Sequence, residues 1–135
     1  SQVSSFNKSG KDRNNFFPED TSLKKVLKIE TETLDNFIEL NSKLVEDLSK
    51  TLLKLDVQGH EFEILKGCEK NITKFKWIIL EISHDYLYEN QASFDQVYKF
   101  LINNNFSFSR SLNYHYQPNN ILIMETDMLF INNKI

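Results

Sequence analysis

Two short stretches of the chain are almost continuously apolar, a pattern typical of strands that are covered on both faces in a parallel sheet. They span residues 51–57 and 76–83, and Trp77 in the second is expected in the core. Between them, residues 60–70 carry apolar side chains at helical spacing, and Gly67 is placed to end that helix. The connection is long enough for a right-handed crossover, so the pattern predicts two parallel neighbouring strands joined by a helix.

Further elements are predicted on both sides of this unit. Alternating positions over residues 26–31 predict a short strand with one buried face. Helices are expected to begin after Thr33 and Ser93, because both residues are favourable N-caps followed by apolar side chains at helical spacing. Closing strands are expected at residues 106–110, 121–124 and 128–132. The alternation of strands and helices predicts an α/β fold.

The first part of the chain lacks such a period. Residues 1–23 are rich in Ser, Asn, Lys and Asp, and we expect an irregular arm there, followed by one partial α/β domain over residues 24–135. Phe6, Phe16 and Phe17 are apolar side chains in the arm, and we expect them to pack against structure outside this chain. Because the chain does not begin with Met, we also expect it to be a partial chain.

Composition and charge narrow the classes of function. The chain has 135 residues, of which 40% are hydrophobic and 26% charged, as in ordinary soluble globular domains. Its net charge of -3 and its scattered Lys and Arg residues provide no basic face for nucleic acid. No run approaches the ~20 apolar residues of a membrane helix. Cys68 is the only cysteine, so we expect no internal disulfide, an inert thiol in the core and a cytoplasmic location.

Acidic residues lie near the carboxyl ends of the two apolar strands, where ligands bind in open α/β sheets. Asp56 and Glu81 would lie about 5 Å apart if the strands are neighbours. Carboxyl groups this close perturb each other, and one of them holds its proton longer, as acid/base chemistry can require. Each residue also has a structural alternative. Asp56 could accept hydrogen bonds from the amides of residues 59–61 and cap the helix, and Lys54 could neutralise Glu81.

Histidines follow the same two strand ends. His60 and His84, with Glu61 and Asp85, could form a general base or a weak metal site. The spacing matches no strong zinc or calcium pattern, so no metal is expected, and an exposed loop position is the favoured explanation for each histidine. A metal-dependent hydrolase built on Asp56, His60, Glu81 and His84 is the third of three alternatives. His115, between two tyrosines, is expected in a loop that covers the sheet.

One segment carries a family resemblance. Residues 52–67, LLKLDVQGHEFEILKG, resemble the pattern of FkbM-like methyltransferases: a hydrophobic strand, Lys-x-Asp-Val, an acidic or amide residue, Gly-x-Glu and Leu-Lys-Gly. Thr-Leu-Asp at 33–35, the strand with Glu81 and the closing elements extend the similarity over roughly residues 26–132. The resemblance implies a Rossmann-like methyltransferase sheet, mostly parallel with an antiparallel closing strand. It also implies S-adenosylmethionine as the methyl donor and methylation of a hydroxyl on a sugar or secondary metabolite.

The chain departs from the family pattern in two respects. In similar enzymes a first strand ends in a glycine-rich turn that lets the backbone approach the cofactor, and a second strand ends in an acid for the ribose hydroxyls. None of the three glycines here forms such a turn, so the N-terminal strands are expected to be absent and the isolated chain to bind the cofactor poorly and to be inactive. Gln58 stands where Glu is frequent, and His60 stands where a small residue is usual.

The resemblance implies the C-terminal portion of a methyltransferase. Asp56, His60 and Glu81 are its candidate catalytic groups, with Asp56 the preferred base and His60 the second choice. Glu61 and His84 are candidates for the side of the site that faces a small-molecule or glycan acceptor, and no cofactor-binding residue is assigned. The alternative is a non-catalytic remnant or interaction module that associates through an exposed sheet edge, as a homodimer or with a complementing N-terminal portion.

Overall fold

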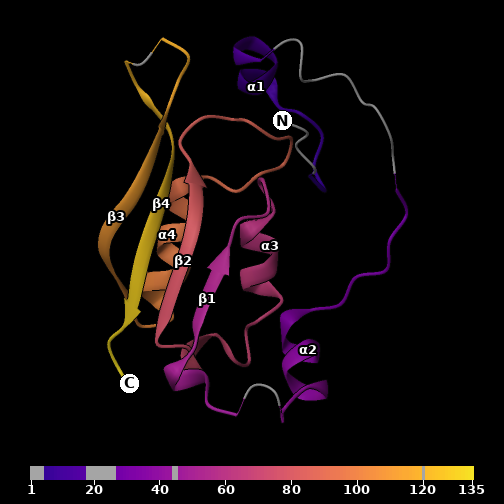
Figure 1. Ribbon diagram of the computed structural model, residues 1–135, viewed down its shortest axis with the longest axis vertical. Coiled ribbons are helices and arrows are strands. Elements are labelled where there is room, and N and C mark those ends of the chain that lie inside the picture. Colours follow the sequence, from indigo (N-terminus) through magenta and orange to yellow (C-terminus); the bar gives the residue numbers. More distant parts are fainter. Residues whose placement is uncertain (1–4, 18–26, 44–45, 120) are drawn as a thin grey trace.

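The structure is a computed structural model that describes residues 5–17, 27–43, 46–119 and 121–135. Figure 1 shows its helices beside and behind one sheet. The helices are α1 (Lys11–Phe16), α2 (Leu34–Leu40), α3 (Glu61–Lys66) and α4 (Phe94–Asn103), with short 3-10 turns at Leu48–Lys50 and Ile72–Lys74. The strands are β1 (Leu52–Leu55), β2 (Trp77–Ser83), β3 (Phe106–Tyr116) and β4 (Ile123–Asn132). No helix in the described part of the chain is long and apolar enough to cross a membrane.

The four strands form one sheet in the order β1-β2-β4-β3. β1 is parallel to β2, whereas β4 is antiparallel to both β2 and β3. A mostly parallel sheet was expected, but parallel pairing in the described residues is confined to β1 and β2. The physical reason is the short connection between β3 and β4, because a short loop can join only antiparallel strands. The predicted reversed strand is present as β4, in a mixed α/β fold.

The central unit follows the sequence pattern. β1, α3 and β2 occur in the predicted order, with β1 and β2 as parallel neighbours. Gly67 is the C-cap of α3, which is shorter than the predicted helix. Thr33 and Ser93 are the N-caps of α2 and α4, and Ser93 forms a complete capping box with Gln96. The two last predicted closing strands merge into the single strand β4.

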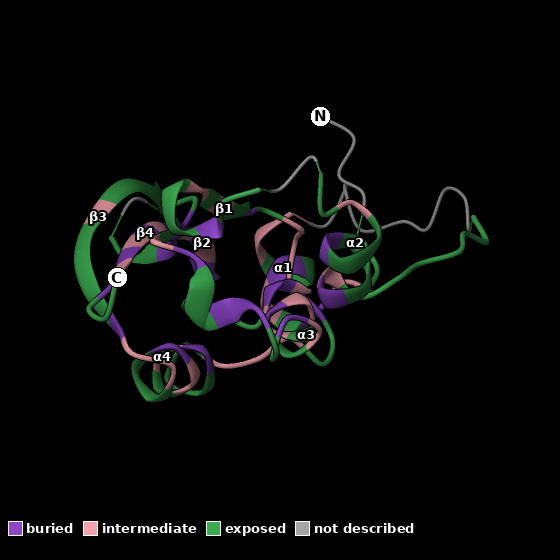
Figure 2. Cartoon of the chain, turned by 90° about the horizontal axis from the view of Figure 1, so that it is seen from below, coloured by how far each residue is buried: buried purple, intermediate pink, exposed green. Residues whose placement is uncertain are grey.

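The core lies between one face of the sheet and the helices α3 and α4. Ile78, Leu80 and Phe130 of the sheet are fully buried there, and so is Cys68, as predicted. Burial raises the pKa of the Cys68 thiol to about 12, which keeps it unreactive. Figure 2 shows α4 against this face and exposed residues along the two edge strands.

The opposite face of the sheet is less covered. Trp77, which was expected in the core, is 36% exposed on that face, and Leu52 at the start of β1 is 48% exposed. β1 was predicted to be covered on both faces, and this was wrong. In the described residues β1 is a sheet edge with a strand neighbour on one side only, so its side chains have fewer atoms to pack against.

The strand predicted at residues 26–31 is also absent from the described part. Residues 27–33 belong to no strand or helix, and Leu27 and Ile29 are 66% and 61% exposed. An alternating pattern forms a strand only where a partner strand offers its backbone groups, and neither edge of the sheet pairs with this segment. Val26 lies outside the described residues.

The N-terminal arm packs on the chain itself. It contains α1, and the Gly10 amide donates to the Leu87 carbonyl at 2.7 Å. A Cβ on Gly10 would lie 2.4 Å from the Tyr86 carbonyl oxygen, so only glycine permits this approach. Phe16 and Phe17 pack against a buried cluster of Leu87, Tyr88 and Met124 rather than against structure outside the chain. Residues 1–4 and 18–23 of the expected arm lie outside the described residues.

Candidate functional site

The carboxyl ends of β1 and β2 carry two acids that one glutamine connects. The register pairs Leu55 with Leu80, so Asp56 and Glu81 follow at the same level of the sheet. Gln58 Nε2 donates to Asp56 Oδ1 at 3.3 Å and to Glu81 Oε2 at 3.1 Å. The structure thus brings together the two carboxyl groups that the sequence placed at this edge. Gln58 holds them without adding a charge of its own.

The turn that presents Gln58 is conformationally demanding. Gln58 and Gly59 both have positive φ angles, 54° and 91°, in the region that L side chains rarely adopt. A Cβ on Gly59 would lie 2.7 Å from the ring of Tyr88, which packs against the turn. Glycine is therefore required at position 59, both for its positive φ angle and for the close contact with Tyr88. This packing fixes the backbone from which the Gln58 side chain extends.

Glu61 stabilises the same turn from the first turn of α3. Its Oε1 accepts hydrogen bonds from the amides of Val57 at 3.0 Å and Gly59 at 3.3 Å, and the residue is 8% exposed. Asp56 was considered for hydrogen bonds from the amides of residues 59–61, but it accepts from the side chains of Lys54 and Gln58, so that alternative was wrong. Glu61 follows the turn on the helix, and its side chain is long enough to reach back to these amides. Glu61 was expected to face the acceptor. Its Oε1 instead binds the backbone amides of the turn, so that oxygen is not free to bind an acceptor.

Asp56 is instead an exposed, ionised carboxylate. Lys54 Nζ lies 3.0 Å from Asp56 Oδ2, and the Asp56 side chain is 45% exposed. The hydrogen bond from Lys54 is the largest cause of a lowered Asp56 pKa, and Gln58 adds to it. Lys54 was the structural partner considered for Glu81, but its hydrogen bond goes to Asp56.

Glu81 has the opposite character. Its side chain is 10% exposed, and its pKa is raised to about 8. Burial is the largest cause, and the nearby carboxylates of Glu125 and Asp56 raise it further. His115 Nε2 lies 3.9 Å from Glu81 Oε1. Two adjacent carboxyl groups thus have well separated acidities, an arrangement that suits acid/base chemistry near neutral pH.

The two candidate histidines lie apart from this pair. His60 precedes α3 as its N-cap, makes no side-chain capping bond, and its ring lies 5.0 Å from that of Phe6. His84 Nε2 lies 2.8 Å from Thr126 Oγ1, and burial lowers the His84 pKa. Thr126 pairs with Ile82, whose side chain points to the face opposite Glu81 because side chains alternate along a strand. His84 is therefore separated from Glu81.

Among the residues that the structure describes, no group of three or more His, Cys, Asp or Glu side chains is arranged to hold a metal ion. Asp85, the other acid considered for such a site, accepts a hydrogen bond from Gln117 Nε2 at 2.9 Å. The geometry gives no support to a metal-dependent hydrolase.

Several residues near the pair were missed by the sequence analysis. Glu125 is 9% exposed, its pKa is raised by burial, and it accepts a hydrogen bond from Ser83 Oγ at 3.0 Å. An acid within the apolar closing strand was the signal that could have found it. His115 belongs to β3 rather than to a loop, and Tyr88, which donates to Gln58, carried no sequence signal.

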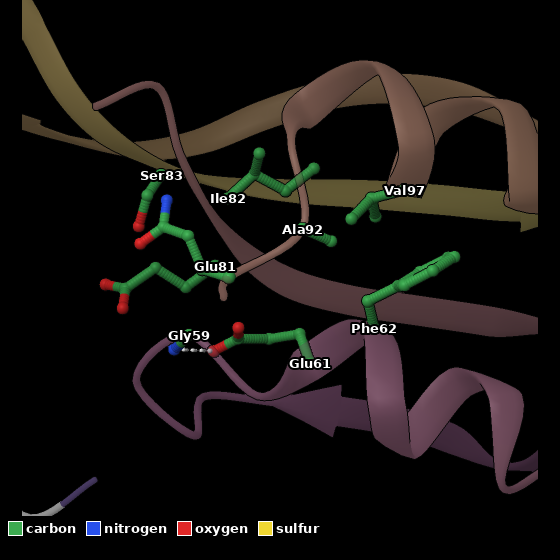
Figure 3. Close-up of a pocket in the computed structure, with 9 residues that line it drawn as sticks. Gly59, Glu61, Phe62, Glu81, Ile82, Ser83, Ala92 and Val97 are labelled. Atoms are coloured by element: carbon green, nitrogen blue, oxygen red, sulfur yellow. Dashed lines mark hydrogen bonds between the residues drawn. The ribbon is translucent and has the colours of Figure 1, made fainter. Parts of the chain in front are cut away.

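A small pocket opens beside the pair at the strand ends. Its volume is about 20 Å³, enough for one or two water molecules. Figure 3 shows the carboxyl groups of Glu61 and Glu81 at one end of the pocket, and Phe62 and Val97 at the other. Gly59, Ile82, Ser83, Gln91 and Ala92 complete the lining. The polar end offers hydrogen-bond acceptors, and the apolar end offers a surface for a small apolar group.

Comparison with known proteins places these residues in a family. The sequence model of the methyltransferase FkbM domain matches residues 2–116, which include β1, α3, β2, α4 and β3. The match also includes Asp56, Gln58 and Glu81. The chain matches none of the curated proteins or solved structures with which it was compared. Since the matched region is most of the chain and contains the carboxyl pair, the chain belongs to the FkbM methyltransferase family.

Proposed function

We propose that this chain forms the acceptor side of a methyltransferase that methylates a hydroxyl group, with S-adenosylmethionine as the donor. In this proposal Glu81 accepts the proton of the acceptor hydroxyl. The observation that carries it is the pairing of an ionised Asp56 with a buried Glu81 through the Gln58 amide. Family membership supports methyl transfer, and the pair supports a hydroxyl acceptor, because a hydroxyl becomes a better nucleophile when a base removes its proton.

Glu81 is preferred over Asp56 as the base for a physical reason. A carboxylate whose pKa lies near the working pH accepts a proton more readily than one with a depressed pKa. The pKa of Glu81 is raised to about 8, whereas Lys54 lowers that of Asp56. His60 is less suitable because its ring lies against Phe6 and makes no contact with the pair. In this proposal Asp56 keeps the pKa of Glu81 high and accepts a hydrogen bond from the acceptor.

The pocket beside the carboxyl pair does not enclose a cofactor. A pocket of about 20 Å³ is far smaller than the ~300–1,000 Å³ of sites that hold drug-sized ligands. We therefore assign no binding residues for S-adenosylmethionine in this pocket. The chemistry that the donor supplies is an electrophilic methyl group.

A sugar or similar polyhydroxylated molecule is the proposed acceptor class. An ionised carboxylate only accepts hydrogen bonds, so Asp56, and Glu81 in the ionised form that acts as the base, match hydroxyl donors. Phe62 and Val97 in the pocket offer apolar contacts to the carbon face of such a molecule. An anionic acceptor is disfavoured, because Glu61, Glu81 and Asp56 surround this edge.

The test uses S-adenosylmethionine with an isotopically labelled methyl group and a panel of sugars and small alcohols. Because the chain alone is expected to be inactive, it is supplied together with a complementing N-terminal portion. We then expect an O-methylated product with the wild type and with the exposed control Glu69→Gln. Glu81→Gln should form product at least ~100-fold more slowly, the typical contribution of a general base. Label on nitrogen, or equal rates for the wild type and Glu81→Gln, would contradict the proposal.

A second candidate is a non-catalytic module that associates through β1. The observation in its favour is that β1 is a sheet edge whose first residue, Leu52, is 48% exposed. An open edge presents unpaired amides and carbonyls to another strand. Titration calorimetry with S-adenosylhomocysteine, performed with a complementing N-terminal portion present, and the mass in solution separate the candidates. A dimer that binds no S-adenosylhomocysteine would favour the module, and binding of S-adenosylhomocysteine would favour the enzyme.

A further inference from the structure

Gln58 uses both ends of its side-chain amide. Its Nε2 donates to Asp56 and Glu81, and its Oε1 accepts a hydrogen bond from the Tyr88 hydroxyl. The two ends of an amide have opposite polarity. If Gln58 turned over, its carbonyl oxygen would face the ionised Asp56 carboxylate and repel it. A Tyr88 hydroxyl whose proton points at Gln58 therefore selects the orientation in which the amide donates to both acids.

Tyr88 is itself held from the N-terminal arm. Arg13 of α1 donates from Nη1 to the Tyr88 hydroxyl oxygen at 3.3 Å, and its guanidinium lies 5.4 Å from the centroid of the Tyr88 ring. Both residues are buried, with 9% and 3% exposed. Arginine can only donate, so the Tyr88 proton is left to point toward Gln58. The hydrogen bonds run in one direction, from Arg13 through Tyr88 and Gln58 to the two carboxyl groups.

The arm also holds the backbone of the same turn. Ser5 Oγ donates to the Gln58 carbonyl at 2.7 Å, and Asn7 Nδ2 donates to the Gly59 carbonyl at 2.8 Å. These bonds join segments more than 50 residues apart in the chain. The backbone and the side chain of Gln58 are thus both fixed by contacts with residues 5–13 or with Tyr88.

We propose that Arg13 and Tyr88 are positioning residues that orient the Gln58 amide and thereby hold Asp56 and Glu81 together as a pair. The N-terminal arm is then part of the site, although none of its residues touches either acid in these contacts. The inference deepens the proposed function, because Glu81 is the proposed base. It concerns the orientation of the two carboxyl groups, which can be measured in the absence of cofactor and acceptor.

Loss of this orientation has a definite electrostatic consequence. Hydrogen bonds that donate to a carboxylate favour its ionised form, so removing them raises its pKa. The substitution Tyr88→Phe leaves unchanged the other charged and titratable groups that face Glu81 from neighbouring elements. These are Lys54 in β1, Asp56 directly after β1, Glu61 in α3, His115 in β3, and Glu125 and Asp127 in β4. A shift caused by Tyr88 therefore reports on Gln58.

The experiment is a carbon-13 NMR titration of the Asp56 and Glu81 carboxyl groups in the complete chain, without cofactor or acceptor. We expect Tyr88→Phe to raise both pKa values by about half a unit or more. Tyr86→Phe is the matched control, since Tyr86 lies in the same loop with 64% of its surface exposed, and should leave both values unchanged. A purely structural role for Tyr88 would lower stability without moving these two pKa values.

Two further measurements complete the test. Gln58→Met keeps the length of the side chain without the amide, and it should raise both pKa values as Tyr88→Phe does, with no further rise in the double variant. In the wild type, the Tyr88 hydroxyl proton should exchange slowly and show a through-space contact with the Gln58 amide, a measurement that stays decisive if Tyr88→Phe does not fold. Unchanged pKa values in a folded Tyr88→Phe, or no such contact, would overturn the inference. None of these measurements depends on methyl transfer, so their failure can be distinguished from failure of the proposed function.

Discussion

Asp56 and Glu81 are chemically similar acids that the fold makes different. Asp56 lies beyond the end of β1, where water and Lys54 favour its charged form. Glu81 lies within β2, where burial and neighbouring carboxylates favour its neutral form. The charge of the pair near neutral pH is therefore set by where each side chain lies relative to solvent, and not by the intrinsic acidity of either residue.

The raised pKa of Glu81 predicts how stability depends on pH. The folded chain holds the Glu81 proton up to about pH 8, whereas the unfolded chain releases it near the ordinary glutamate pKa of 4.5. Between these values the folded state binds more protons, so the contribution of Glu81 to stability falls as pH rises. Glu81→Gln cannot lose a proton and should be more stable than the wild type at pH 8, by about 1–2 kcal/mol.

The measurement is urea denaturation of the wild type and Glu81→Gln at pH 5 and pH 8. Glu69→Gln, at an exposed position, should follow the wild type at both. A difference between wild type and Glu81→Gln that does not grow from pH 5 to pH 8 would contradict the raised pKa.

At the scale of elements, two loops after parallel strands and the N-terminal arm form one assembly. The β1–α3 turn, the β2–α4 loop and the arm contact one another through Gly59, Tyr88 and Gly10. Each glycine permits a close approach that a Cβ would prevent. Gly10 and Gly59, two of the three glycines of the chain, thus lie at the contacts between these segments.

Gly10→Ala is expected to detach the arm from the β2–α4 loop. Its Cβ would lie 2.4 Å from the Tyr86 carbonyl oxygen, an approach that the backbone cannot accommodate without moving. The amide at position 10 should therefore lose its bond to Leu87 and exchange its hydrogen faster, by roughly tenfold or more, which native-state hydrogen exchange measures.

Gly67→Ala is the control, because its nearest contacts, at 3.4 Å or more, are ordinary and its φ of -70° suits alanine. It should leave exchange in the arm unchanged. Normal protection of residue 10 in Gly10→Ala would show that the arm does not lie where the structure places it.

For the molecule as a whole, the core is one-sided. Helices α3 and α4 cover one face of the sheet, while Trp77 and Leu52 remain partly exposed toward the other. The buried cluster that includes Cys68 spans α2, α3, α4 and every strand, so this part of the chain should unfold as one cooperative unit.

Cys68 gives a probe of that cooperativity. The thiol is fully buried and its pKa is raised to about 12, so it should not react with a thiol reagent at pH 8 while the chain is folded. Its rate of modification should rise with urea in parallel with global unfolding followed by circular dichroism. Rapid modification in native buffer would show that the core opens locally.

The local sequence determined the elements whose stabilising contacts are also local. Apolar runs and N-caps identified β1, α3, β2 and α4, because strand burial and capping leave a direct pattern in neighbouring residues. The prediction of a strand at residues 26–31 was wrong because a strand also needs a partner strand, which an alternating sequence pattern does not supply. The motif around Asp56 also determined the family.

Only the tertiary structure decided which acid is ionised and what holds the pair. Burial of Glu81, the pairing of Lys54 with Asp56 and the chain of hydrogen bonds from Arg13 through Tyr88 to Gln58 join distant parts of the sequence. Such contacts depend on distances across the fold, and no local pattern of residues encodes them. The sequence by itself therefore placed two carboxyl groups at one sheet edge, and the packing around them determined their charge and orientation.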